Sequence, residues 1–191
     1  MIVVIDDFIK DPDLLREIQS DESFFEQTGS YFFWEGWWHS PPNTLKKRLI
    51  KYIWGDHPPL SQIFSVAGFE YWTGITTADQ YSRFLDNLET HFDKDEDFFE
   101  KTGEIQSPII GSVYYPPQDE FVGGMLEIFS AGIDKDPERI YAKPNRLVIF
   151  DAGKDPHAVS KVTSGTRKAI AINLWGFVPH SELNGKLKKE I

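Results

Sequence analysis

Two residues with metal-binding side chains, His91 and Asp93, are separated by one residue in the segment Leu88-Glu89-Thr90-His91-Phe92-Asp93, and a third candidate, His157, follows much later. In an extended strand, residues i and i+2 point to the same face, so one imidazole and one carboxylate would converge. A histidine from a distant strand would complete one face of an octahedron and leave three positions open. This donor set suits non-haem Fe(II) chemistry with O2. A His-x-Asp pair alone is more often an ordinary surface feature, so its context decides.

The context includes Arg167, which follows His157 by ten residues. Gly165 is a turn signal, and the chain on either side of it reads as strand, over 156–162 and 167–178. These runs predict a hairpin that holds His157 and Arg167 on adjacent strands. Arginine is the side chain best shaped to bind a carboxylate through two hydrogen bonds, so Arg167 is a candidate anchor for a dicarboxylate co-substrate.

The elements that would position these residues are short strands preceded by helices. Asp11 followed by Pro12 predicts the start of one helix, and Asn43 predicts the cap of a second. Many short strands with Gly, Pro and Asp-rich turns favour a sandwich or barrel. We therefore expect a mostly β chain with N-terminal helices (α+β) and a double-stranded β-helix, or jelly roll. The expected strands are 2–5, 66–72, 88–93, 109–115, 125–129, 139–142, 147–151 and the terminal hairpin.

Composition bounds the class of protein. The 191 residues favour a single domain, 1–191, with an N-terminal strand and supporting helices over 1–64, a jelly-roll core over 65–178 and a C-terminal tail over 179–191. A hydrophobic content of 40% and a charged content of 26% indicate a globular chain. The formal charge of −10 argues against nucleic-acid binding, which requires phosphate neutralisation. We find no transmembrane run and no signal peptide, so we expect a cytoplasmic protein; the oligomeric state stays open.

The chain resembles the Fe(II)- and 2-oxoglutarate-dependent dioxygenases, and within them it is most similar to the prolyl 4-hydroxylase-like branch. The resemblance covers about residues 65 to 178, with its motifs in the order and spacing of the family. The segments that carry it are His91-Phe92-Asp93, Val113-Tyr114-Tyr115, Gly123-Gly124-Met125-Leu126, Pro156-His157-Ala158-Val159, Gly165-Thr166-Arg167 and Leu174-Trp175.

This resemblance implies iron ligation by His91, Asp93 and His157, and binding of the far 2-oxoglutarate carboxylate by Arg167. Many relatives place serine two residues after the arginine, whereas this chain has Ala169, so a hydroxyl partner must come from elsewhere. Tyr115 is the best match for that partner. A second tyrosine of the family corresponds to Tyr71 or Tyr81, and Tyr71 is favoured because its segment reads as strand.

The implied cofactors are Fe(II), the co-substrate 2-oxoglutarate and O2, with ascorbate as a further candidate. The implied reaction hydroxylates a substrate carbon and releases succinate and CO2. A peptidyl proline is the substrate that the resemblance suggests, and a free amino acid or other small molecule is the alternative. From a different class, a non-catalytic jelly-roll binding module of the lectin-like or accessory type stays open. A cupin-like metal enzyme without an oxoacid fits less well because it leaves Arg167 unexplained.

Two further segments could shape the substrate entrance. The acidic run that follows Asp93 should lie near the rim of the barrel. The aromatic stretch 31–38 has six aromatic residues in eight and could pack across the mouth, although about half of it should be core. We therefore expect Trp37 or Trp38 to contact substrate, and an aromatic wall with an acidic rim to suit a proline-containing or basic peptide.

Overall fold

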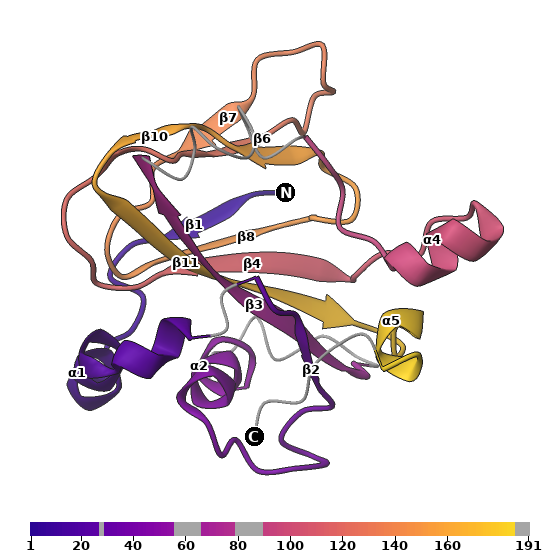
Figure 1. Ribbon diagram of the computed structural model, residues 1–191, viewed down its shortest axis with the longest axis horizontal. Helices are drawn as coiled ribbons and strands as arrows, with labels where there is room; N and C mark the ends of the chain where they lie inside the picture. The colour runs from indigo at the N-terminus through magenta and orange to yellow at the C-terminus, as the bar shows by residue number, and fades with distance from the viewer. Residues whose placement is uncertain (27–28, 56–65, 79–89, 186–191) are drawn as a thin grey trace.

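Two layers of antiparallel strands face each other in the computed structural model, which describes residues 1–26, 29–55, 66–78 and 90–185 (Figure 1). The large layer is a six-stranded sheet in the order β1-β8-β4-β11-β3-β2. Its strands are β1 (Val3–Ile5), β2 (Phe32–Trp34), β3 (Gly68–Thr77), β4 (Ile110–Tyr115), β8 (Arg146–Phe150) and β11 (Thr166–Trp175). The small layer contains the sheet β7-β6-β9 and the pair β10-β5. Its strands are β5 (Val122–Gly123), β6 (Leu126–Ile128), β7 (Glu138–Ile140), β9 (His157–Val159) and β10 (Val162–Ser164). The predicted jelly roll is confirmed.

Helices cover the outer face of the large sheet. The helices α1 (Pro12–Ser20) and α2 (Leu45–Trp54) lie on this side, with the 3₁₀ turn η1 (Glu22–Phe25) between them in sequence (Figure 1). Asp11 caps α1 as predicted, since its side chain accepts hydrogen bonds from two backbone N–H groups of the first turn. The predicted cap of α2 is wrong by one residue: Thr44 accepts the bond from the Lys47 N–H, whereas Asn43 accepts one from the Lys47 ammonium.

Strand alternation divides the large sheet into two chemically different faces. On β11, Ile170, Ile172 and Leu174 point into the core beneath the helices, where they meet Leu49 and Ile50 of α2. The alternate residues of β11 face the small layer instead. The same alternation applies to β3, because β3 and β11 pair residue for residue along their full lengths. The inner face of these two strands forms the floor of the site described below.

The predicted hairpin between His157 and Arg167 is wrong. His157 begins β9, which pairs with β6 in the small sheet, whereas Arg167 lies on β11, between β3 and β4 in the large sheet. The chain crosses from one layer to the other at Gly165, whose φ is +76°. A Cβ there would lie 2.6 Å from the carbonyl oxygen of Glu120, so a side chain does not fit. The two residues therefore face each other across the interior rather than along one sheet.

The predicted strand over 88–93 is corrected in part. Residues 88 and 89 lie outside the described residues, and only an isolated bridge joins His91 to His157. The reciprocal backbone hydrogen bonds of this bridge are 3.1 and 2.9 Å long. Asp93 has no strand partner, but its N–H donates to the carbonyl of Ala152 at 2.9 Å. These bonds fix the backbone of the His-x-Asp segment without a regular strand.

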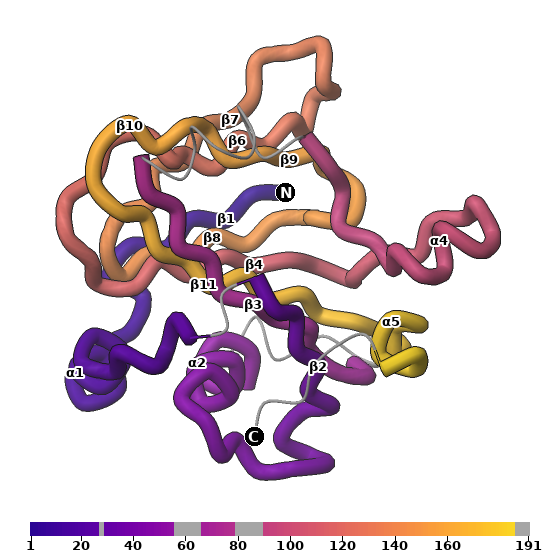
Figure 2. Tube along the Cα trace, in the orientation of Figure 1, coloured from indigo at the N-terminus to yellow at the C-terminus, as the bar shows by residue number. Residues whose placement is uncertain are grey.

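Segments near both ends of the chain contribute to this architecture. β1 lies beside β8 (Figure 2), and Arg146 of β8 binds Asp6 through two hydrogen bonds of 2.5 and 2.8 Å. After β11, helix α5 (His180–Leu183) packs against α4 (Glu96–Thr102), and the backbone N–H of His180 donates to Asp95 at 2.6 Å. The division of the chain at residues 64 and 178 stays a prediction. No helix in the described ranges is both long and apolar enough to cross a membrane.

Candidate metal and co-substrate site

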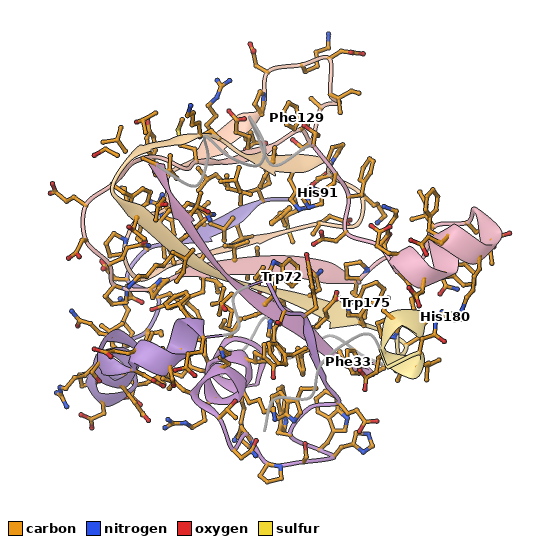
Figure 3. All side chains as sticks on the ribbon, viewed as in Figure 1. Phe33, Trp72, His91, Phe129, Trp175 and His180 are labelled. Atoms are coloured by element: carbon orange, nitrogen blue, oxygen red, sulfur yellow. The ribbon has the colours of Figure 1, made fainter. Side chains whose placement is uncertain are left out.

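A pocket of about 460 Å³ lies between the two layers and extends toward α4 and α5. Its floor is the inner face of β3 and β11. The floor residues pair across the two strands as Thr76 with Arg167, Gly74 with Ala169, Trp72 with Ala171 and Glu70 with Asn173. In Figure 3, the lining residues His91, Trp72 and Trp175 follow one another from the small layer toward α5. The volume is in the range of small-molecule sites.

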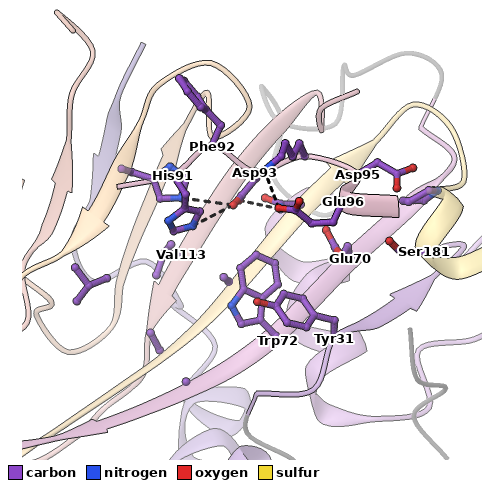
Figure 4. A pocket seen from close by; sticks show the side chains of 18 of the residues that line it. Tyr31, Glu70, Trp72, His91, Phe92, Asp93, Asp95, Glu96, Val113 and Ser181 are labelled. Carbon is purple, nitrogen blue, oxygen red and sulfur yellow. Dashed lines mark hydrogen bonds and ion pairs between the residues drawn. The ribbon is translucent and has the colours of Figure 1, made fainter. Parts of the chain in front are cut away.

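His91, Asp93 and His157 converge at this pocket. Asp93 Oδ1 lies 3.5 Å from His91 Nε2 and 3.6 Å from His157 Nε2 (Figure 4). One candidate ligand atom from each residue lies within 4.8 Å of the others. Their side chains are 42%, 13% and 9% exposed, respectively, so the cluster has one open side. Among the described residues, the structure thus brings together the three that the sequence pattern selected.

Neighbouring groups orient the three side chains. His157 Nδ1 lies 3.1 Å from the carbonyl oxygen of Asp155, and a proton donated there leaves the Nε2 lone pair directed at the pocket. Asn173 Nδ2 donates to Asp93 Oδ2 at 2.9 Å, which turns Oδ1 toward both imidazoles. Burial raises the pKa of Asp93, but the neighbouring imidazoles of His157 and His91 more than offset it, so its pKa lies well below the usual range. Asp93 is therefore a carboxylate at neutral pH.

A buried guanidinium occupies the other end of the pocket. Arg167 is only 5% exposed, and its Nε donates to the carbonyl of Gly124 at 2.9 Å. A Cβ on Gly124 would lie 2.6 Å from Cδ of Arg167, so the glycine permits this close approach. No carboxylate of the described residues forms an ion pair with Arg167. A buried cation without a counter-ion is unfavourable, which points to an anionic ligand.

The tyrosines predicted to assist Arg167 behave differently. Tyr115 is fully buried in the interior; its hydroxyl lies 3.4 Å from an Arg167 Nη atom and its ring lies 5.2 Å from the guanidinium carbon. The prediction that Tyr71 faces the co-substrate is wrong. Tyr71 points to the helix side of β3, where its ring stacks on that of Phe32, with centroids 5.6 Å apart. Consecutive strand residues face opposite ways, and the pocket belongs to Glu70 and Trp72. Tyr81 lies outside the described residues.

The expected aromatic wall is formed by other residues. Trp37 and Trp38 pack against Phe69 on the helix side of β3. Their ring centroids lie 5.6 and 5.9 Å, respectively, from that of Phe69, and neither residue lines the pocket. Tyr31 and Trp72 line it instead, with ring centroids 4.9 Å apart. The acidic segment 93–97 also lines the pocket, as expected.

Three polar or aromatic pocket residues were missed from the sequence: Glu70, Trp72 and Asn173. Glu70 Oε2 accepts a hydrogen bond from the indole N–H of Trp175 at 3.1 Å. Burial raises the pKa of Glu70 to about 7, and the charge of Asp93 adds to this shift, whereas hydrogen bonds from Trp175 and Asn173 act in the opposite direction. The signal was present in the strands, where Glu70 and Asn173 interrupt runs of apolar residues.

The residues fit Fe(II) and 2-oxoglutarate. Two imidazoles and one carboxylate are the donors that non-haem Fe(II) takes in facial triads. Between this cluster and Arg167, β11 contributes only the small side chains of Ala169 and Ala171 to the floor, and Gly74 lies opposite Ala169, which leaves room for a ligand. Fold and site together define a jelly-roll protein with a candidate mononuclear metal site and an anion-binding end.

Comparison with known proteins extends this definition. The family model of the 2OG-Fe(II) oxygenase superfamily matches residues 79–175, and the chain belongs to this superfamily. It is therefore a 2-oxoglutarate-dependent dioxygenase that uses Fe(II), 2-oxoglutarate and O2. A search of curated protein sequences finds no significant match.

Solved structures support the fold. A prolyl-4-hydroxylase from Pseudomonas putida is 13% identical, with a TM-score of 0.59 and 91% of each chain covered. A prolyl 4-hydroxylase from Phytophthora capsici is 14% identical, with a TM-score of 0.58. The alignment covers 92% of this chain and 58% of that one. NgTET1 in complex with 5mC DNA is 13% identical, with a TM-score of 0.50 and coverage of 91% and 71%. At these identities the likeness concerns the fold, which serves more than one kind of substrate.

Proposed function

We propose that this dioxygenase holds Fe(II) through His91, Asp93 and His157, and 2-oxoglutarate through Arg167. The observation that carries the proposal is the buried Arg167 guanidinium, which has no carboxylate partner in the described part of the chain and opens into the same pocket as the triad. A dianion with one end at a metal and the other at a guanidinium satisfies both groups at once. A cupin-like site without an oxoacid would leave Arg167 unpaired, and a binding module has no use for the triad.

The chain's own residues position the reactants. Arg167 is held by the Gly124 carbonyl, so its remaining N–H groups are directed at the ligand. Tyr115 lies beside it as a second donor. Asn173 and the carbonyl of Asp155 keep Asp93 and His157 in their binding orientations. Bound iron and 2-oxoglutarate supply the oxidation, in which one oxygen atom of O2 enters a substrate C–H bond and the other enters succinate as CO2 leaves.

For the substrate, we propose a carbon of a peptide, with prolyl residues as the first class to test. The Tyr31–Trp72 pair at the substrate end supports this choice, because proline rings and extended peptides pack well on aromatic faces. The fold likeness to prolyl hydroxylases makes it a natural starting point, and a free amino acid or other small molecule is the alternative.

Anaerobic titration tests the co-substrate site. Adding 2-oxoglutarate to the Fe(II)-loaded protein should produce a visible charge-transfer band, and air should then yield succinate in amounts that a substrate increases. Arg167→Ala should weaken the band at a given 2-oxoglutarate concentration. Arg139→Ala, which removes an arginine bound to Glu127 at the surface, is the matched control and should behave as wild type. Absence of the band in wild type at saturating 2-oxoglutarate would rule the proposal out.

A further inference from the structure

The end of the pocket away from Arg167 contains a carboxylate without a cationic partner. Glu70 faces the pocket from β3, opposite Asn173 of β11. Its hydrogen-bond donors are neutral: the indole of Trp175, at 3.1 Å, and the side-chain amide of Asn173. No lysine or arginine of the described residues forms an ion pair with it. A carboxylate withdrawn from water in this way is stabilised by a cation that arrives from outside.

Two aromatic rings stand beside this carboxylate. Trp72 is two residues from Glu70 on the same strand and therefore shares its face. Tyr31 packs on Trp72 from the adjoining segment, with ring centroids 4.9 Å apart. Figure 4 shows Glu70 between these rings and the carboxylates of Asp93 and Glu96. Burial and, next, the negative charge of Glu70 raise the pKa of Tyr31. Aromatic faces next to a carboxylate form a favourable environment for a cationic nitrogen.

Three other acidic groups at this end already have partners. Asp95 caps α4 through the N–H of Phe98 and binds His180 at 2.9 Å. Asp97 accepts a hydrogen bond from the amide of Asn184. Glu96 pairs with Lys94 at 2.8 Å. Lys94 is thus occupied. Glu100 also lines the pocket but is exposed, whereas Glu70 is withdrawn from water and has only neutral hydrogen-bond donors among the described residues.

We propose that Glu70, with Tyr31 and Trp72, binds an ammonium or guanidinium group of the substrate and thereby makes this enzyme a hydroxylase of cationic substrates. The inference rests on the proposed function, since it assigns the substrate end of the same pocket. The cation can come from a basic side chain of a peptide or from a free basic amino acid. In either case its nitrogen sits at Glu70, and the carbon that is hydroxylated lies between that nitrogen and the triad. The reaction is C–H + O2 + 2-oxoglutarate → C–OH + succinate + CO2.

The test uses the full chain loaded with Mn(II) and 2-oxoglutarate, so that binding is measured without turnover. Calorimetric titrations compare charged ligands with neutral isosteres: arginine with citrulline and lysine with norleucine. Each is used both as the free amino acid and within a blocked proline-containing peptide. We expect the charged member of a pair to bind at least about tenfold more tightly. Tighter binding of the peptides identifies a basic peptide as the source, and tighter binding of the free compounds identifies an amino acid.

Variants then locate the effect. Glu70→Gln should reduce the affinity for the charged ligand by about tenfold or more and leave that for the neutral isostere within about twofold. Glu100→Gln removes an exposed carboxylate that lines the same pocket and should change neither by more than about twofold. Equal affinities for charged and neutral ligands, or equal losses in both variants, would overturn the inference.

Two measurements distinguish failure of the cation subsite from a positioning role of Glu70 and from failure of the proposed function. Loss of Mn(II) affinity in Glu70→Gln, with no change in ligand selectivity, would show that Glu70 only positions Asn173 beside Asp93 and would reject the substrate role. Failure of the proposed function appears elsewhere, as 2-oxoglutarate binding that Arg167→Ala does not weaken. A protein that binds 2-oxoglutarate through Arg167 but discriminates no charge would keep the proposed function and refute the cation subsite.

Discussion

The two ends of the pocket are opposites in charge and in construction. At one end, Arg167 is a buried cation for which the described residues offer no carboxylate; at the other, Glu70 is a carboxylate for which they offer no cation. The Arg167 end is enclosed by paired strands and by a glycine that touches the guanidinium stem. The Glu70 end is bordered by α4, α5 and the half-exposed Tyr31. The difference is what we expect if the Arg167 end is a fixed site for one dianion and the Glu70 end a more accessible site for a ligand of the opposite charge.

The largest effect should come from the triad, on which both ends depend. Asp93→Ala removes the carboxylate that offsets the metal charge, so we expect Mn(II) or Co(II) affinity to fall on the order of a thousandfold, since orienting neighbours alone contribute roughly 10–100-fold. Asn173→Ala should then fall within that smaller range. Calorimetric titration with the metal measures the affinity of both variants. Wild-type affinity in Asp93→Ala, His91→Ala and His157→Ala alike would show that the metal lies elsewhere.

Next comes the cationic end. Arg167→Ala should weaken 2-oxoglutarate binding by roughly 2–5 kcal/mol, because the distal carboxylate is left unpaired in a buried site, and Arg167→Lys should recover only part of the loss. Metal affinity should stay at the wild-type value, as Arg167 does not contact the triad. Calorimetry on the Mn(II)-loaded variants gives both numbers. A parallel loss of metal affinity would mean that the two ends are not independent.

The acidic end predicts a pH-dependent stability in the metal-free protein. Because burial raises the pKa of Glu70 from 4.5 to about 7, the folded state retains a proton that the unfolded chain has released between these values. Stability from this group is fully present below pH 4.5 and is lost as the pH rises through 7. Glu70→Gln removes this loss. The free energy of unfolding of the variant, relative to that of wild type, should therefore rise by about 1–3 kcal/mol between pH 5 and pH 8. Urea unfolding at both pH values measures it, with Glu100→Gln as control; an advantage independent of pH would contradict the assignment.

The smallest effect should come from Tyr115. Its hydroxyl lies 3.4 Å from Arg167, which is long for a hydrogen bond, so we expect it to contribute little to holding the guanidinium and to act mainly on the proposed ligand. Tyr115→Phe keeps the ring and removes one donor, and 2-oxoglutarate affinity should fall by about 0.5–1.5 kcal/mol. A loss as large as that of Arg167→Ala would move the principal anchor from the arginine to the tyrosine.

The comparison also explains what could be predicted from the sequence. His91, Asp93, His157 and Arg167 could be selected because their residue types are chemically restrictive and their order along the chain is informative; the structure places them at one pocket, and their roles stay predictions. The hairpin between His157 and Arg167 was wrong because a glycine turn looks the same in sequence whether it joins neighbouring strands or crosses between layers. That distinction depends on the strands β3, β4 and β6, which are distant in the chain and pair with the two segments.

The predictions that Tyr71 contacts the co-substrate and that Trp37 or Trp38 contacts the substrate were wrong for a different physical reason. Strand alternation separates Glu70 and Trp72 from Phe69 and Tyr71, but it does not say which pair faces the pocket, because helices cover one face of the large sheet and the small layer covers the other. Both faces therefore carry aromatic residues. Trp37 and Trp38 are as aromatic as Tyr31, yet they pack against the helix-side face of β3. The polar residue in each run, Glu70 or Asn173, was the available indication of the inner face.

The position of β11 in the large sheet has a consequence for how this protein is made. β11 follows every other strand in sequence but lies between β4 and β3, with five residue pairs to the first and ten to the second. Until the ribosome has released this segment, β4 and β3 each present an open edge, and such edges pair readily with other chains. The nascent chain therefore carries the triad without the sheet that completes the pocket, and closure of the large sheet awaits the synthesis of β11.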